Sequence, residues 1–179
     1  PQPAYRLADN LERLVLQGKA DLTGTGNAGV NQLEGNAGNN RLDGLGGNDI
    51  LLGGAGDDTL IGGAGSDVLK GGVGRDLFVF DVMETSANRD RVVDFKVGED
   101  KIGLAGSVFA HLGSTDTGLL DPGKLAIGTA ATAAEAQLYY NPQTGNLFYD
   151  SDGTGAAAAV RIANLPTNLN LTAESFAVL

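Results

Sequence analysis

The stretch that decides the fold runs from Gly26 to Val79 and divides into six units of nine residues without an insertion: GNAGVNQLE, GNAGNNRLD, GLGGNDILL, GGAGDDTLI, GGAGSDVLK and GGVGRDLFV. The fourth residue of every unit is glycine, and the eighth is large and apolar. The sixth residue is Asn31, Asn40, Asp49, Asp58, Asp67 or Asp76. A strict period of this kind indicates stacked repeats.

The composition of one unit predicts its local structure. The first six residues are rich in Gly, Asn and Asp, which form turns that need positive φ or close backbone approach. The last three residues, with one apolar side chain in the middle, suit a short strand that faces inward. Two units then make one coil with two strands facing each other. Because one unit cannot bury its apolar residue alone, the coils must stack into an all-β fold.

The glycine content suggests that apolar burial alone does not hold these coils together. The block contains sixteen glycines, and each loses much backbone freedom on folding. One buried apolar side chain in nine residues returns little free energy in exchange. We therefore expect a bound ligand to contribute to stability.

The aspartates indicate which ligand this is. Coils stack about 4.8 Å apart, so equivalent turns lie eighteen residues apart in the sequence. This spacing places Asp49 above Asp67 on one edge, and Asp58 above Asp76 on the other. Carboxylates together with turn carbonyls form the all-oxygen environment that Ca²⁺ prefers over Zn²⁺ and Mg²⁺.

The units resemble the nonapeptide Gly-Gly-x-Gly-x-Asp-x-apolar-x of the repeats-in-toxin (RTX, haemolysin-type calcium-binding) family. This resemblance implies a right-handed parallel β-roll with Ca²⁺ between successive turns, in a bacterial protein secreted by the type I secretion apparatus. It implies one calcium site formed by Leu45, Gly47, Asp49, Gly62, Ala64 and Asp67. It implies a second site, on the other edge, formed by Gly54, Gly56, Asp58, Gly71, Val73 and Asp76.

The ends of the block depart from this pattern. Asn31 and Asn40 are neutral, so we expect weak or absent calcium sites there and a hydrogen-bonded amide ladder in their place. Beyond the last repeat, an end site is an open alternative to plain surface charges in a hairpin. The candidate ligands of such an end site are Gly63, Gly65, Asp90, Asp94 and Asp100.

The flanking segments suggest three regions. Residues 1–25 are expected to form an irregular coil or cap, residues 26–80 the roll, and residues 81–179 a C-terminal β cap with a secretion signal. Residues 136–150 predict a hairpin, and residues 156–165 a strand, with a helix as the alternative. The segment after Phe80 resembles the one that follows the roll in serralysin-type proteases, and the ending ESFAVL is similar to uncleaved type I export signals.

Composition narrows the range of partners. The formal charge of −10 argues against nucleic acid and anionic membranes, and the absence of cysteine excludes disulfides and thiolate metal sites. No apolar run is long enough for a membrane helix, so we expect no membrane insertion. Because the chain begins at Pro1 without a signal peptide, we expect it to be the C-terminal piece of a longer protein. We also expect it to be a monomer.

No catalytic centre is predicted. His111 is the single histidine, and neither a His-Glu-x-x-His nor a Gly-x-Ser-x-Gly motif occurs. The stretch DSDGTG at 150–155 is interpreted as a polar turn, because Arg161 stands where an EF-hand needs Glu. The leading hypothesis is a calcium-binding module that folds on Ca²⁺ binding and serves secretion. The alternatives are an accessory polysaccharide-binding module, and a structural segment of a surface adhesin or S-layer protein.

Overall fold

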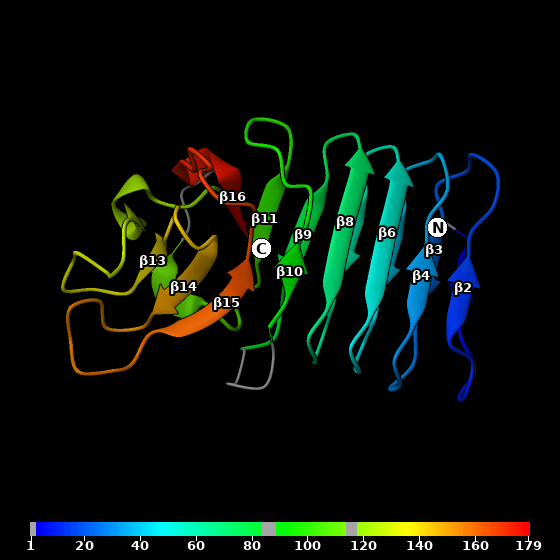
Figure 1. Ribbon diagram of the computed structural model, residues 1–179, viewed down its shortest axis with the longest axis horizontal. Coiled ribbons are helices and arrows are strands. Elements are labelled where there is room, and N and C mark those ends of the chain that lie inside the picture. The colour runs from blue at the N-terminus through cyan, green and yellow to red at the C-terminus, as the bar shows by residue number, and fades with distance from the viewer. Residues whose placement is uncertain (1–2, 84–88, 114–117) are drawn as a thin grey trace.

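Two facing β-sheets form the body of the molecule (Figure 1). The structure, a computed structural model, describes residues 3–83, 89–113 and 118–179. In sheet order, the seven-stranded sheet contains β1 (Ala4–Arg6), β3 (Thr23–Thr25), β5 (Arg41–Asp43), β7 (Thr59–Ile61), β9 (Leu77–Phe80), β11 (Lys101–Leu104) and β16 (Phe176–Val178). From β1 to β11 the chain alternates between this sheet and the second one, so that each pair of strands completes a coil.

The second sheet has nine strands. In sheet order from the C-terminal cap, they are β12 (Leu125–Ile127), β13 (Gln137–Tyr140), β14 (Asn146–Asp150), β15 (Val160–Asn164), β10 (Arg91–Val92), β8 (Val68–Val73), β6 (Ile50–Ala55), β4 (Gln32–Glu34) and β2 (Arg13–Val15). Short 3₁₀ turns lie at Ala110–Leu112, Pro122–Lys124 and Ala173–Ser175. None of the described helices is long and apolar enough to cross a membrane.

The repeats pair in parallel with a fixed register. Ile50 pairs with Val68 in the second sheet, and Thr59 pairs with Leu77 in the first. The eighth residue of each unit therefore stacks on its equivalents inside the roll, where all six are fully buried: Leu33, Leu42, Leu51, Leu60, Leu69 and Phe78. The predicted all-β parallel roll is confirmed.

The same sheets extend past the repeats on both sides. β1 and β2 pair in parallel with β3 and β4, so residues 4–25 begin the roll. On the other side, β10 pairs with β8 and β11 pairs with β9, again in parallel. Because β10 and β11 belong to different sheets, residues 91–104 form a further coil and not a hairpin.

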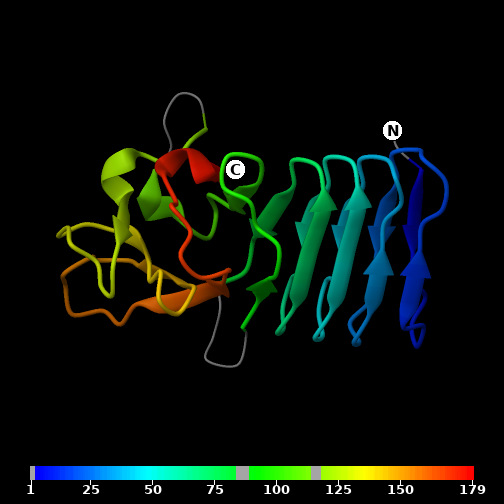
Figure 2. The same cartoon turned by 45° about the horizontal axis from the view of Figure 1, so that its top comes forward.

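The C-terminal region closes the far end of the roll (Figure 2). β13 and β14 form the predicted antiparallel hairpin, with Leu138 opposite Tyr149. The predicted strand within 156–165 is β15, and no helix forms there. The 176–178 strand, β16, pairs in parallel with β11 and buries Phe176 in the continuous core.

Candidate metal sites at the two edges of the roll

The turns between the sheets stack into two edges. The first edge contains the turns 26–31, 44–49 and 62–67, and the second contains 35–40, 53–58 and 71–76. Along the first edge, Oδ1 of Asp49 accepts a hydrogen bond from the backbone N–H of Asn31 (2.7 Å). In the same way, Oδ1 of Asp67 accepts from Asp49 (2.7 Å), and Oδ1 of Asp90 accepts from Asp67 (2.9 Å). Each carboxylate is therefore fixed by the coil before it.

The second edge carries an equivalent ladder. Oδ1 of Asp58 accepts from the N–H of Asn40 (2.7 Å), and Oδ1 of Asp76 accepts from Asp58 (2.9 Å). Asp100 continues the series by accepting from the N–H of Asp76 (3.0 Å). The sixth-position aspartates of both edges thus hold the same orientation, with Oδ1 engaged by the preceding coil.

The other carboxylate oxygen has no such partner in the middle of the roll. Oδ2 of Asp49, Asp58 and Asp67 is buried and accepts no hydrogen bond. Each of these residues is 1% exposed. A buried charged oxygen without a partner is costly, so these three atoms mark positions where a cation would be stabilising.

A backbone carbonyl of the next coil converges on the same point. A Cβ atom built on Gly44 would collide with Oδ2 of Asp49 and would lie 2.6 Å from the carbonyl oxygen of Gly62. At Gly53, the equivalent Cβ would collide with Oδ2 of Asp58 and would lie 2.5 Å from the carbonyl oxygen of Gly71. Glycine at the first position is required because a side chain would fill this space. The resulting donor set contains only oxygen, which fits Ca²⁺.

The remaining predicted carbonyls lie in the ladder between coils. The carbonyl of Leu45 accepts from the N–H of Ala64, and the carbonyl of Ala64 accepts from the N–H of Gly47 (both 2.9 Å). The carbonyl of Val73 likewise accepts from the N–H of Gly56 (2.9 Å). A carbonyl oxygen has a second lone pair, so these bonds are compatible with a further ligand.

Three more predicted carbonyls lie against glycines of the following coil. Those of Gly47, Gly54 and Gly56 abut the α-carbons of Gly65, Gly72 and Gly74, respectively. The structure therefore brings Asp49 close to Gly62, and Asp58 close to Gly71. The complete ligand sets stay predictions.

The candidate end-site residues finish the two ladders. Asp90 and Asp100 are only 3% and 4% exposed, so they are buried and not surface charges. Oδ2 of Asp100 accepts from the N–H of Lys96 (2.8 Å), which leaves both of its oxygens partnered. The carboxylate of Asp94 accepts from two backbone N–H groups, those of Gly71 (3.0 Å) and Gly72 (2.9 Å).

The two glycines of the same candidate group lie one coil earlier. Gly63 and Gly65 have positive φ and abut the carbonyls of Leu45 and Gly47. Both glycines thus belong to the stacking of turns 44–49 and 62–67.

Burial raises the pKa of the edge carboxyls. The pKa of Asp49 and of Asp58 rises to about 7, first through desolvation and then through repulsion from Asp67 and Asp76, respectively. Desolvation raises the pKa of Asp76 to about 6, with a further contribution from Asp100. It also raises the pKa of Asp67. Without a cation, the edges therefore hold their negative charge unfavourably at neutral pH.

The 150–155 turn and His111 lie outside the two edges. In the turn, Oδ2 of Asp152 accepts from the N–H of Ala157 (3.0 Å), while its Oδ1 is buried without a hydrogen-bond partner. Nδ1 of His111 lies 3.5 Å from the hydroxyl of Tyr149. In the part of the chain that the structure describes, no three His, Cys, Asp or Glu side chains gather into a conventional metal site.

Comparison with known proteins identifies the repeat block. Residues 25–60 and 52–81 match the RTX calcium-binding nonapeptide repeat (four copies). A solved structure, the solution structure of the AlgE6R3 subunit from the Azotobacter vinelandii mannuronan C5-epimerase, is 26% identical, with 92% of this chain and 82% of that chain covered and a TM-score of 0.45. No curated protein matches significantly. Residues 25–81 are thus a block of RTX calcium-binding nonapeptide repeats.

Proposed function

We propose that this chain is a calcium-responsive folding module, in which Ca²⁺ is held between successive coils on both edges. The observation that carries the proposal is the set of buried, unpartnered Oδ2 atoms of Asp49, Asp58 and Asp67, which lie within the matched repeats. When bound, calcium supplies the positive charge that these carboxylates lack.

The proposed ligands follow the geometry of the edges. Asp49 with the carbonyl of Gly62, and Asp58 with the carbonyl of Gly71, are the central pairs. The other proposed ligands of the first site are Leu45, Gly47, Ala64 and Asp67, and those of the second are Gly54, Gly56, Val73 and Asp76. At the end of the roll, the orphaned oxygen of Asp67 supports a third position closed by Asp90.

Calcium dependence of folding follows from linkage. Burial and stacking of the carboxylates disfavour the folded roll in the absence of a cation. A ligand that binds only the folded state adds about 2.7 kcal/mol of stability per site at a hundredfold excess over its Kd. The module is therefore expected to be largely unfolded where calcium is scarce and folded where it is abundant.

This switch suits a secreted protein. We propose that the module belongs to a larger extracellular bacterial protein and is itself unfolded during passage through the type I secretion apparatus. Calcium outside the cell then favours folding. The RTX repeats and the acidic charge of −10 support this role. The comparisons assign no catalytic activity to this chain.

Far-UV circular dichroism during a calcium titration from EDTA, with magnesium in parallel, tests the proposal. We expect a calcium-specific gain of β structure. In an Asp58→Asn variant, the calcium concentration at the midpoint of this transition should rise by at least about tenfold, because the charge of the ligand set governs affinity. Asp57→Asn is the matched control: it is adjacent, and its Oδ1 accepts from the N–H of Arg75, but its Oδ2 already pairs with Arg75. A β spectrum unchanged in EDTA would refute the folding switch.

A further inference from the structure

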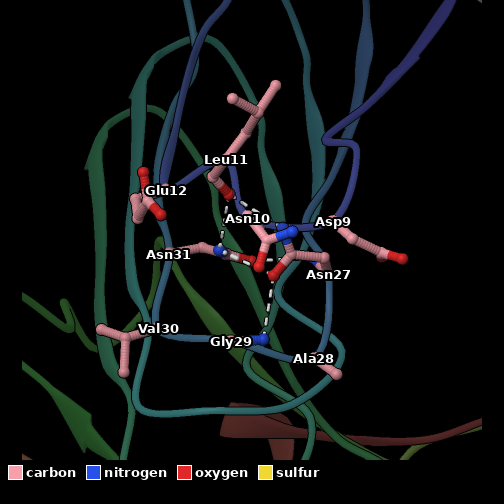
Figure 3. A pocket seen from close by; sticks show the side chains of 9 residues that line it. All are labelled: Asp9, Asn10, Leu11, Glu12, Asn27, Ala28, Gly29, Val30 and Asn31. Carbon is pink, nitrogen blue, oxygen red and sulfur yellow. Dashed lines mark hydrogen bonds between the residues drawn. The ribbon is translucent and has the colours of Figure 1, made fainter.

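In the first two repeats, asparagine amides and not carboxylates form the contacts between the turns at the edges. In the turn 26–31, shown in Figure 3, Asn27 and Asn31 point toward one another. The backbone N–H of Asn27 donates to Oδ1 of Asn31 (2.7 Å), and Nδ2 of Asn31 donates to Oδ1 of Asn27 (3.1 Å). Oδ1 of Asn27 also accepts from the N–H of Gly29 (2.8 Å).

The amide nitrogen of Asn27 reaches the coil before it. Nδ2 donates to the carbonyl oxygens of Ala8 (2.9 Å) and Leu11 (2.8 Å). A second-position side chain thus joins two turn carbonyls of the preceding coil to the sixth-position side chain of its own turn. Asn27 and Asn31 are both buried, and every polar side-chain atom of the pair is engaged.

The same arrangement recurs on the other edge, nine residues later. The N–H of Asn36 donates to Oδ1 of Asn40 (2.7 Å), and Nδ2 of Asn40 donates to Oδ1 of Asn36 (3.1 Å). Nδ2 of Asn36 donates to the carbonyls of Gln17 (3.1 Å) and Ala20 (3.0 Å). Because the same pair of hydrogen bonds occurs on both edges, we interpret it as a feature of these two repeats and not of one turn.

The backbone differs between the two kinds of turn. In the first Asp turn, Leu45 and Gly47 have φ of 72° and 104° at the second and fourth positions. Asn27 and Gly29, at the same positions, do not have positive φ. The Asp turn leaves an unpartnered oxygen, whereas the Asn turn leaves none.

We propose that Asn27 and Asn36 replace the metal in the first two repeats, because their amide nitrogens donate to carbonyls of the preceding coil. Residues 4–43 then form a calcium-independent template on which the Asp-containing coils fold when calcium is present. This inference rests on the proposed function only in assigning calcium to the later coils.

Hydrogen exchange of the whole chain, followed by mass spectrometry in EDTA and in calcium, tests the template. In EDTA, we expect backbone amides of residues 23–43 to remain protected while those of residues 50–80 exchange freely. Fast exchange of residues 23–43 in EDTA would overturn the inference. Equal protection of residues 50–80 in EDTA and in calcium would instead overturn the proposed function, so the two failures are distinguishable.

Two variants make the test specific to the amides. Asn36→Ala removes the bridging amide and should accelerate exchange of residues 32–43 in EDTA by about tenfold, the loss expected for one or two net hydrogen bonds. Asn39→Ala, in the same turn, is the control, because Asn39 is exposed and accepts a single hydrogen bond from the N–H of Asp57. Equal exchange in both variants would contradict the assignment.

Conversion of an amide turn provides an independent check. In a chain with Asn27→Gly and Asn31→Asp, protection of residues 23–34 in EDTA should be lost and should return with calcium. The number of calcium ions bound per chain, measured by equilibrium dialysis, should also increase. Protection in EDTA equal to that of the unaltered chain would overturn the replacement of metal by amide.

Discussion

At the scale of single residues, the two carboxylate oxygens of an edge aspartate have different roles. Oδ1 of Asp58 orders the stack by accepting from the N–H of Asn40, while Oδ2 is left buried and unpartnered. In the Asn turns the side chain bonds differently: Oδ1 of Asn31 accepts from the N–H of Asn27 in its own turn, and Nδ2 donates to the carbonyl of Leu11 in the coil before it. Asn and Asp therefore share the sixth position of the repeat, but only Asp leaves an oxygen for a cation.

The titration of these carboxyls predicts how acid affects the calcium-free chain. The pKa of Asp49 and of Asp58 is raised to about 7 in the folded state, above the usual 3.8, by desolvation. Their protonated forms therefore favour folding, fully at pH below about 4, and this contribution is lost as pH rises through about 7. In EDTA, the β signal in far-UV circular dichroism should therefore increase when pH is lowered from 8 to 5. A signal in EDTA independent of pH would contradict the burial of these groups.

The same pKa shifts predict proton release on calcium binding. Because calcium binds the ionised carboxylates, its apparent affinity should fall as pH is lowered from 8 to 6. Calorimetry in buffers of different ionisation enthalpy would measure the protons released. An Asp49→Asn variant should release fewer protons than the unaltered chain, and Asp57→Asn should release the same number.

The glycine at the first position of the turn offers a second residue-scale prediction. In Gly44→Ala, the new methyl group would collide with Oδ2 of Asp49 and the carbonyl of Gly62. We expect a loss of about 1–3 kcal/mol in the unfolding free energy in calcium, as for other overpacked sites. Gly46→Ala is the control from the same turn, since its nearest neighbour would lie 3.7 Å away. Similar urea midpoints for the two variants would argue against the close approach.

At the scale of elements, the period of nine residues was sufficient to predict the repeat strands. The eighth position of each unit identified the six inward-facing residues, the first of which is Leu33 and the last Phe78, and all six are fully buried. The hairpin of β13 and β14 was also predictable from its local pattern. Asn27 and Asn36 were missed, although asparagine in place of glycine at the second position was a visible signal.

Two features lay beyond what a local pattern specifies. Residues 91–104 alternate apolar and polar side chains, and that alternation is the same for a hairpin and for one more coil. The carboxylates of Asp90 and Asp100 favour the further coil over a hairpin, because each accepts a hydrogen bond from a backbone N–H of the preceding coil. The pairing of β16 with β11 is equally hidden, since the two strands are far apart in the sequence.

The position of β16 predicts that it stabilises the roll. Phe176 is fully buried in the core shared by both sheets, so Phe176→Ala should lower the unfolding free energy by about 3–5 kcal/mol in calcium. Leu179→Ala, at a residue that is 58% exposed, should have little effect. Urea denaturation followed by circular dichroism would compare the two. A small effect of Phe176→Ala would show that β16 is dispensable for the fold.

At the scale of the whole molecule, the charge of −10 raises the question of whether calcium acts by general screening. Screening by salt is effective between exposed charges and weak between buried ones. Because Asp49, Asp58 and Asp67 are buried, 0.5 M sodium chloride should not restore the β spectrum of the chain in EDTA, whereas millimolar calcium should. Recovery in sodium chloride alone would indicate screening and not site binding.

The parallel pairing of β11 with β16 has a consequence for the order of assembly. Residues 104 and 178 are partners, so roughly seventy residues must form a closed loop before the first sheet is complete. Closing so long a loop costs entropy before any contact repays it, which makes this a late event in folding. The open side of β11 therefore stays unpaired until residues 176–178 arrive, however early the coils before it have formed.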